Sequence, residues 1–370
     1  MNFICNQSKL TKALNIVSKA VSTRTTIPIL RGILLEVSGD MLTLSASDLD
    51  ISIIKTVKIQ GNQDGRIVVN AKLFSDVIRK LPNSDIEFKL EDGKLLISCL
   101  NSKFDLIVSS ADDFPNVNKI SQENSMIFDK NIFKDIIKRT TFAASIDESK
   151  GIITGTLIEL SDNSLKMVAI DGFRMAVNTE EISENYNGKI VISSKILNDI
   201  GRIISESEED VDYIKFSMSD NSASVRYGSI EVNLRLMEGE FIKYNDVLPK
   251  ENPIKIRVNR VALNEAIERA SLLSKEGKNN LIKLDCTQGS MAISSRSDEG
   301  SVVEEVLIEK SGDDIEIGFN AKYLIDILKV IDDEEIELNM NNPISPCLVK
   351  PTEGIRYEYL ILPVRITKSI

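Results

Sequence analysis

Hydrophobic and polar positions follow an order along this chain that occurs three times. Each time, a short apolar run leads into an amphipathic segment that begins with Asn or Ser and has Lys at its third position. A large apolar residue is fourth and Asp is seventh. The three copies span residues 70–81, 193–204 and 320–331. This spacing is far longer than a solenoid unit, so the repeat predicts whole domains in tandem.

Two further elements recur around this segment. Apolar residues at helical spacing predict another helix near the start of each third, over residues 8–21, 129–143 and 259–275, with Ser8 and Asn259 as suitable N-caps. Alternating apolar positions around turn clusters predict a hairpin after each of these helices. Each third therefore reads helix, hairpin, strand, helix, hairpin and final strand. That order is typical of an α+β domain in which an antiparallel sheet carries two helices on one face.

Polar, turn-prone stretches at residues 120–124 and 249–253 separate the thirds. They predict domains at residues 1–121, 122–250 and 251–370. The chain has 370 residues, of which 42% are hydrophobic, so each domain has enough apolar residues for its own core.

Charge changes this picture of three similar domains. The formal net charge is −11, which does not suggest a nucleic-acid-binding protein. Each of the six predicted helices nevertheless carries a net positive charge, so the negative charge is concentrated outside them. A shared basic surface of this kind would attract phosphates without reading bases. The alternative is that each helix merely has a solvated polar face.

Several classes of chemistry are absent. The chain has no histidine, which removes Ser-His and Cys-His nucleophile pairs and the commonest zinc ligand. There is no phosphate-binding GxxxxGK[ST] loop. The four cysteines form no CxxC pair and are expected to be buried thiols. We expect no cofactor and no metal. No signal peptide or membrane-spanning run is evident, which fits a cytoplasmic protein.

Motifs along the whole chain resemble those of a known family, the bacterial sliding clamp or beta subunit of DNA polymerase III. Their order and spacing together are specific, although each alone is weak. They are Arg24–Leu30 (RTTIPIL), Asp113–Asn116 (DFPN), Val168–Ala176 (VAIDGFRMA), Glu238–Phe241 (EGEF) with Val247–Pro249 (VLP), and Tyr359–Ile366 (YLILPVRI).

The resemblance implies a ring-shaped, head-to-tail homodimer made of three tandem DNA-clamp domains per chain. It implies that this ring encircles duplex DNA without sequence preference and tethers the replicative polymerase for processive synthesis, without being an enzyme. The helices would line the hole. The residues expected to face DNA there are Arg24, Lys72, Arg79, Lys138, Lys195 and Arg202.

The resemblance also implies a hydrophobic groove between the second and third domains. In the family this groove holds a short linear motif carried by polymerases, the clamp loader and other partners. Phe173 stands where the family usually has His, and Ile170 where Thr is common, so the groove is expected to be more apolar here. The matching positions are Ile153, Ile170, Gly172, Phe173, Arg174, Met175, Val247, Leu360, Leu362, Pro363, Val364 and Arg365.

A third implied site is the subunit joint. Phe104 and Leu106 on an edge strand of one chain are expected to meet Leu272 and Leu273 on a helix of the other. Two lysines, Lys72 and Lys103, are expected to face the acids near Glu299, Glu304 and Glu305.

Two other functions are compatible with parts of the sequence. Acidic residues at Asp48 and Asp50, Asp112 and Asp113, and Asp171 suit a two-metal nuclease, although acids at turns commonly form Asx turns instead. A protein-binding scaffold without DNA is the other alternative, and the basic helices argue against it.

Overall fold

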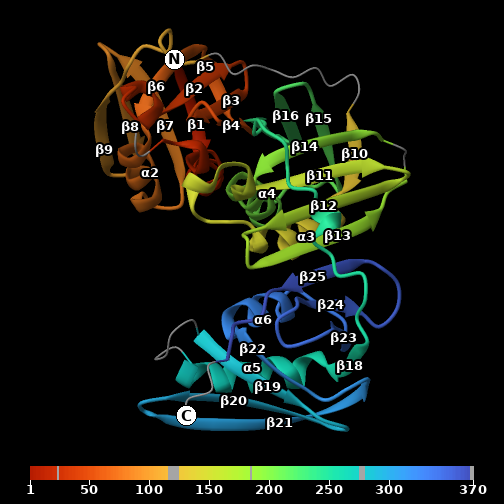
Figure 1. The fold of residues 1–370 in the computed structure, drawn as a ribbon. Helices are drawn as coiled ribbons and strands as arrows, with labels where there is room; N and C mark the ends of the chain where they lie inside the picture. Colours follow the sequence, from red (N-terminus) through yellow and green to blue (C-terminus); the bar gives the residue numbers. More distant parts are fainter. Residues whose placement is uncertain (23–24, 116–124, 184–185, 275–279, 367–370) are drawn as a thin grey trace. The chain divides into compact units, whose positions relative to one another are not determined.

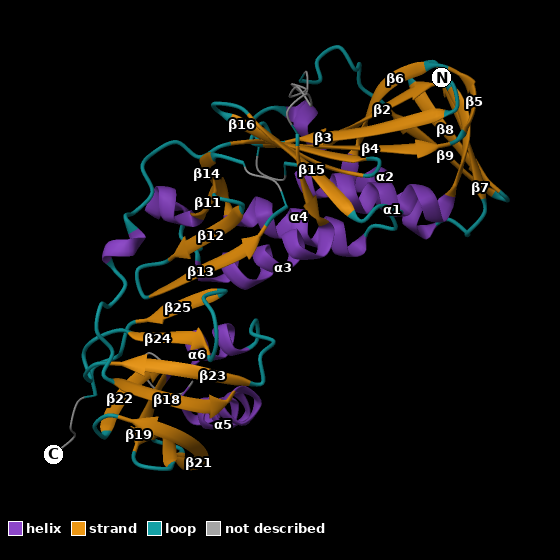
Figure 2. Cartoon of the chain, turned by 90° about the vertical axis from the view of Figure 1, so that its right-hand side faces the viewer, coloured by secondary structure: helices purple, strands orange, loops and turns teal. Residues whose placement is uncertain are grey.

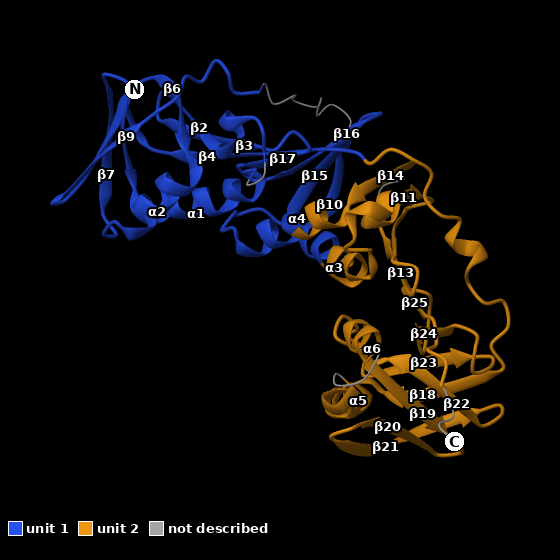
Figure 3. Cartoon of the chain, turned by 60° about the vertical axis from the view of Figure 1, so that its left-hand side comes forward, with its two compact units in different colours: residues 1–134, 199–236 blue, residues 135–198, 237–370 orange. Residues whose placement is uncertain are grey.

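The structure, a computed structural model, describes residues 1–22, 25–115, 125–183, 186–274 and 280–366. Its elements are antiparallel strands with helices packed against them, as the sequence predicts for an α+β protein (Figure 1). The chain forms two compact units (Figure 3). Unit 1 consists of residues 1–134 and 199–236, and unit 2 of residues 135–198 and 237–370.

Unit 1 contains two antiparallel sheets. The smaller has five strands, in the order β5 (Gln60–Gln63), β1 (Asn2–Asn6), β7 (Asp85–Glu91), β8 (Lys94–Cys99) and β9 (Ser102–Ile107). The larger has eight, in the order β10 (Met126–Asp129), β15 (Tyr213–Met218), β16 (Ser222–Tyr227), β17 (Ile230–Arg235), β4 (Ile51–Lys58), β3 (Met41–Ser47), β2 (Gly32–Ser38) and β6 (Gly65–Asn70).

The eight-stranded sheet joins two sequence repeats. Strand β4 of the first third pairs with β17 of the second, and Ile53 lies opposite Val232. Both side chains are buried, so the hydrophobic pattern of the two strands fixes this register. The boundary between repeats is therefore crossed by continuous backbone hydrogen bonding.

Unit 2 is built on one twelve-stranded sheet, and it also joins two repeats, through pairing of β13 with β25. The order is β14 (Gly188–Ser193), β11 (Gly155–Ser161), β12 (Ser164–Ile170), β13 (Arg174–Glu181), β25 (Tyr357–Ile361), β24 (Cys347–Pro351), β23 (Glu335–Met340), β18 (Ile254–Asn259), β21 (Gly300–Ser311), β20 (Ser290–Ser297), β19 (Leu281–Cys286) and β22 (Ile315–Asn320).

The helices lie where the sequence predicts them. They are α1 (Gln7–Val17), α2 (Ala71–Lys80), α3 (Lys130–Thr140), α4 (Ser194–Glu206), α5 (Arg260–Ser274) and α6 (Ala321–Leu328). Helix α1 lies beside α2 and packs on β3 and β4, and α5 lies beside α6 and packs on β19, β20 and β21 (Figure 2).

Asparagine side chains cap the N-termini of several of these helices. Asn70 accepts a hydrogen bond from the Leu73 amide at 2.9 Å, and Asn259 from the Ala262 amide at 3.0 Å, which satisfies otherwise unpaired donors of the first turn. The predicted cap Ser8 is wrong. Helix α1 starts one residue earlier, and Asn6 caps it by accepting from the Ser8 amide.

All four cysteines are buried and unpaired, as predicted. Burial raises the pKa of Cys5 to about 11 and of Cys286 to about 12, so neither is a reactive thiolate at neutral pH. Among the described residues, no helix is long and apolar enough to cross a membrane.

Candidate partner-binding and nucleic-acid surfaces

Arg174, the first residue of β13, is the centre of a charged network in unit 2. Its Nε donates to Asp171 Oδ2 at 3.1 Å and its Nη1 donates to Asp326 Oδ2, on α6, at 2.5 Å. Nη2 donates to the Phe142 carbonyl at 2.9 Å. Only 9% of the Arg174 side chain is exposed. A buried guanidinium with three acceptors positions its neighbours and is not itself available to a ligand.

Aromatic rings complete the surroundings of this guanidinium. Its carbon lies 5.3 Å from the Phe142 ring centre and 4.6 Å from that of Tyr323, distances typical of cation–π contacts. Burial raises the pKa of Tyr323, and the neighbouring Asp171 adds to the effect. Tyr323 is therefore a neutral phenol held in place by Arg174.

The turn between β12 and β13 directs the Phe173 side chain toward solvent. The Asp171 carboxylate accepts from the amides of Phe173 and Arg174 at 2.8 and 3.0 Å, and Gly172 has a φ of 94°, which favours glycine. The Phe173 ring is 53% exposed and stacks on Tyr323, with centroids 6.2 Å apart. The Lys150 ammonium lies 5.9 Å from its centroid. The exposed Phe173 ring is therefore held in position by its contacts with Tyr323 and Lys150.

The predicted groove positions divide by burial. Met175, Leu360 and Ile170 belong to one buried hydrophobic cluster, and Ile153 packs against it. Met175, Leu360 and Ile170 therefore form core, and Ile153 is partly buried. The exposed members with large apolar side chains are Phe173, Val247 at 38% and Leu362 at 37%. We refer to these three residues as the apolar patch.

Backbone contacts place the patch residues relative to this core. The Leu362 amide donates to the Phe173 carbonyl at 2.9 Å, which holds these two residues together. Val247 follows the short 3-10 helix Tyr244–Asp246, and Tyr244 belongs to the same buried cluster.

The last predicted groove residues lie elsewhere. The Val364 amide donates to the Gly318 carbonyl of β22 at 2.8 Å. Arg365 lines a separate cavity of about 610 Å³ with Ile254 and Asp313. Pro363 lies between the patch and this segment in sequence, so the structure brings only part of the predicted set together.

Four supporting residues were missed at the sequence level, namely Phe142, Lys150, Tyr323 and Asp326, and Asp171 was considered there only as a metal ligand. Asp171 and Asp326 carried a signal. Asp171 lies inside the VAIDGFRMA motif, and Asp326 is the seventh residue of the third repeat. Arg174 lies three residues after Asp171, so that contact is local, whereas the sequence does not indicate the contact between Arg174 and Asp326.

The predicted DNA-facing residues that the structure describes are all exposed. In the described part of the chain, Lys72, Lys138 and Lys195 have no ion-pair partner. Arg79 pairs with Asp76 and Arg202 with Asp199, each one helical turn away. Arg24 lies outside the described residues. The basic side chains are therefore accessible to phosphates on the helices that carry them.

A neighbouring arginine shows why exposure matters. Arg139 adjoins Lys138 in sequence, but it is 13% exposed and pairs with Glu180 at 2.8 Å and Asp332 at 3.2 Å. It therefore serves the packing of unit 2, whereas Lys138 faces solvent.

Two sheet edges carry the residues predicted for the subunit joint. Strand β9 ends the five-stranded sheet, with Phe104 at 40% and Leu106 at 9% exposure. In β21, residues 300–307 pair with β20, and only residues 308–311 pair with β18. The first part of β21 therefore also forms an open edge in the described part of unit 2. On α5, Leu272 is 64% exposed and Leu273 is half-buried.

These edges also carry large apolar side chains that the sequence did not single out. Ile107 on β9 is 82% exposed, and Val303 and Leu307 on β21 are 70% and 83% exposed. Alternation in each strand places them on the face opposite the core. Among the predicted charged residues, Lys103 is exposed, and Glu304 pairs with Arg269 within the same chain at 2.8 Å.

Three of the acids considered for a nuclease, Asp48, Asp112 and Asp171, act as turn and ion-pair residues. Asp48 accepts from the amides of Asp50 and Ile51, Asp112 accepts from the Ser110 hydroxyl, and Asp171 binds Arg174. Over the described ranges, no group of three or more acidic, cysteine or histidine residues is arranged to hold a metal ion.

Comparison with known families gives a match over nearly the whole chain. The N-terminal, central and C-terminal domain models of the DNA polymerase III beta subunit match residues 1–118, 128–243 and 245–365. The chain is 33% identical to a beta sliding clamp of Staphylococcus epidermidis and 32% identical to one of Staphylococcus aureus. Each alignment covers 99% of both chains.

Solved structures give the same result. The chain is similar to a putative DNA polymerase III beta subunit from Eubacterium rectale (36% identity, TM-score 0.93) and to the DNA polymerase sliding clamp of Bacillus subtilis (29% identity, TM-score 0.95). It is also similar to a sliding clamp of Pseudomonas aeruginosa bound to griselimycin (28% identity, TM-score 0.92). Each comparison covers 99% of this chain and 100% of the other.

Proposed function

Because the chain belongs to the DNA polymerase III beta subunit family, the beta sliding clamps, we propose that it encircles duplex DNA and tethers the replicative polymerase. Members of this family are non-catalytic processivity factors of DNA replication, with DNA and polymerase as partners. The full-length match to all three domain models is the observation that carries the proposal.

The proposed assembly is a head-to-tail homodimer of three-domain chains, with domains at residues 1–121, 122–250 and 251–370. A heterologous contact of this kind joins unlike surfaces and closes into a ring. The open edges of β9 and β21 support it, because an unpaired edge gains backbone hydrogen bonds from a second chain. Phe104 and Leu106 then meet Leu272 and Leu273, with Lys72 and Lys103 near Glu299, Glu304 and Glu305.

The proposed DNA contact is electrostatic and independent of sequence. Twelve helices at about 10 Å spacing leave a hole of roughly 28 Å, which admits a duplex. Exposed lysines and arginines on the helices attract phosphates without fixing a register, so the ring slides. Acidic surface elsewhere keeps DNA from binding the wrong face. The residues assigned to this role are Arg24, Lys72, Arg79, Lys138, Lys195 and Arg202.

The apolar patch is the proposed docking site for the short linear motif of partner proteins. Phe173, Val247 and Leu362 offer exposed apolar surface over a packed core, which suits an aliphatic or aromatic anchor residue. Partners of this kind are the replicative polymerase, the clamp loader and other proteins with such a motif, all in the cytoplasm.

A loading experiment tests the topological part of the proposal. The protein is loaded by a clamp loader onto nicked circular plasmid, the complex is isolated, and the plasmid is then cut once. We expect the protein to stay on circles and to leave after cutting. Protein that remains bound after cutting, or that never associates with circles, would show that it does not encircle DNA. A scaffold without DNA would give the second result.

A pair of helix variants tests the joint. Leu273→Asp buries an unpaired carboxylate in the proposed contact and should give monomers in sedimentation. Val261→Asp, on the exposed face of the same helix, is the control and should leave the dimer intact. A Leu273→Asp protein that remains dimeric at micromolar concentration contradicts the assignment.

A further inference from the structure

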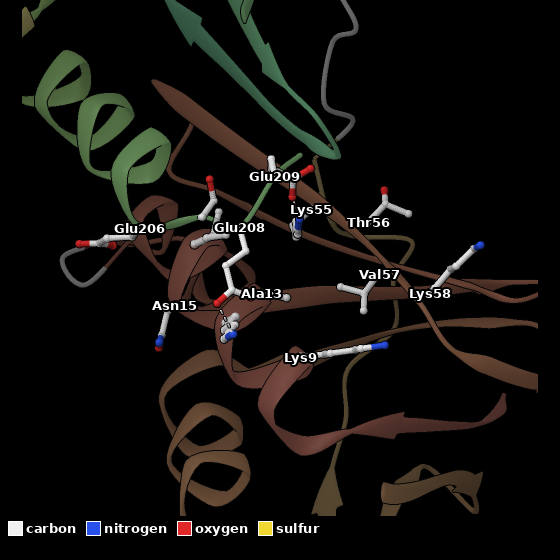
Figure 4. A pocket seen from close by; sticks show the side chains of 13 residues that line it. Lys9, Ala13, Asn15, Lys55, Thr56, Val57, Lys58, Glu206, Glu208 and Glu209 are labelled. Carbon is white, nitrogen blue, oxygen red and sulfur yellow. Dashed lines mark hydrogen bonds and ion pairs between the residues drawn. The ribbon is translucent and has the colours of Figure 1, made fainter. Parts of the chain in front are cut away.

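Unit 1 contains a cavity of about 460 Å³ between α1, β4 and the segment that follows α4. Four lysines line it: Lys9 and Lys12 from α1, and Lys55 and Lys58 from β4 (Figure 4). Ala13, Ile16 and Val57 contribute apolar wall, and Glu206, Glu208 and Glu209 close one side. The volume is in the range of small-molecule sites and too small for a duplex. None of these lysines is among the residues assigned above to the DNA contact or to the subunit joint.

One of the four lysines is permanently engaged. Lys55 forms an ion pair with Glu209 and donates to the Ser229 hydroxyl at 2.6 Å. Both side chains of the pair are 13% exposed. Although burial works in the opposite direction, hydrogen bonds from Lys55 and the Ser229 amide hold the pKa of Glu209 below its ordinary value. This pair is part of the cavity wall and is not free to bind a ligand.

A second lysine is held only loosely. Lys12 Nζ contacts Glu208 Oε1 at 2.6 Å, but these side chains are 54% and 74% exposed. Exposed ion pairs of this kind contribute little because water and salt screen them. An incoming anion of higher charge therefore displaces Glu208 at small cost.

The other two lysines have no partner among the described residues. Neither Lys9 nor Lys58 forms an ion pair there, and both are exposed. Figure 4 shows that they extend to the same side of the cavity, away from the Glu206–Glu209 segment. Two like charges at one side of a cavity repel each other, and a bound anion removes that repulsion.

We propose that this cavity binds a small phosphorylated molecule with at least two linked phosphates, through Lys9 and Lys58, and that Lys12 joins them when Glu208 is displaced. A diphosphate supplies several acceptor oxygens and a compact negative charge that match three ammonium groups. The apolar walls accommodate the organic part of such a molecule. The proposal stands apart from ring formation, because every residue in it belongs to one chain and none is assigned to the subunit joint.

Calorimetric titration of the full-length protein with pyrophosphate, and separately with ADP, tests the proposal. We expect saturable binding of both probes at a single site. The double variant Lys9→Gln/Lys58→Gln should weaken binding by about tenfold or more, because two charge-assisted contacts are lost. Glu208→Gln frees Lys12 and should strengthen binding severalfold.

Matched variants separate this site from a general effect of net charge. Lys89→Gln/Lys94→Gln and Glu87→Gln change the charge by the same amounts on β7 and β8, away from the cavity, and should leave the affinity unchanged. Circular dichroism checks that each variant is folded.

Three results would overturn the proposal. Absence of saturable binding at millimolar probe is one. Equal affinity in the wild type and in Lys9→Gln/Lys58→Gln is another. The third is competition by a short duplex whose own binding is weakened by the same double variant, because the lysines would then be a DNA contact. A protein that binds pyrophosphate but does not load onto circular DNA would contradict the proposed function and leave the proposal for this cavity standing.

Discussion

Asp76 and Asp326 occupy the same position in two copies of the repeated segment, yet they have different roles. Asp76 pairs with Arg79 one turn along α2, and the two side chains are 46% and 60% exposed. Asp326, on α6, pairs with Arg174 on β13, and these side chains are 29% and 9% exposed. One pair is local and solvated, whereas the other joins a helix to a strand that is distant in sequence.

The difference shows that the repeat specifies a helix and that strand pairing decides what the helix does. Coulomb attraction between exposed charges is weakened by water, so the Asp76 pair contributes little to stability. The Arg174 guanidinium is largely buried, also binds Asp171 and the Phe142 carbonyl, and supports the exposed ring of Phe173 through Tyr323. Three variants test this contrast and a fourth tests a second buried pair, Lys55 with Glu209, in order of decreasing expected effect.

Arg174→Ala should have the largest effect. It leaves two carboxylates without their buried partner and removes the contacts with two aromatic rings, so we expect a loss of about 3 kcal/mol in local opening free energy. Hydrogen exchange of the β13 and β25 amides measures it. Arg79→Ala is the matched control, and a similar loss in α2 would remove the contrast.

Glu209→Gln should come next, at about 2 kcal/mol, because the carboxylate accepts charge-assisted hydrogen bonds from Lys55 and Ser229. The pKa of Glu209 lies below its ordinary value of 4.5, so its contribution is complete above that pH and is lost as the pH falls through the lowered value. The melting temperature of the wild-type protein should therefore fall at acid pH. The variant should be less stable near neutral pH and less sensitive to acid, and equal acid sensitivity in both would contradict the pairing.

Asp326→Ala should lower the opening free energy of α6 and β13 by about 1–2 kcal/mol, less than Arg174→Ala, because Arg174 keeps Asp171 and the Phe142 carbonyl. It should also loosen the support of Phe173 and weaken binding of a partner-motif peptide. Fluorescence anisotropy with a labelled peptide checks this. Ile355→Ala, at an exposed site in unit 2, should not change peptide affinity.

Asp76→Ala should have the smallest effect, within about 0.5 kcal/mol, as is usual for an exposed pair one helical turn apart. Exchange of the α2 amides measures it. A loss comparable with that of Asp326→Ala would mean that position in the repeat, and not burial, determines the contribution.

Local patterns in the sequence predicted most of the fold. Helical spacing of apolar residues and the predicted cap Asn259 placed the helices, because these signals act within a few residues. The predicted N-cap of α1 failed because Asn6 and Ser8 both suit a cap, and only the backbone of β1 selects Asn6.

Long-range pairing was beyond such patterns. Nothing near Ile53 in the sequence indicates Val232 as its neighbour, and nothing near Asp326 indicates Arg174. The residues predicted for the groove also included both buried and exposed side chains. Periodicity does not separate Met175, which is fully buried, from its neighbour Phe173, which is half exposed, because a turn held by Asp171 sets that difference.

The two strand pairings that cross repeat boundaries, β4 with β17 and β13 with β25, limit how this chain can be divided. A fragment cut between repeats would expose a long hydrophobic strand edge of the kind that aggregates. A protease or a gene truncation that removed one repeat would therefore leave insoluble material and not a smaller working protein. The two compact units that keep these pairings intact are discontinuous in sequence, so gain or loss of a single repeat by recombination would be selected against.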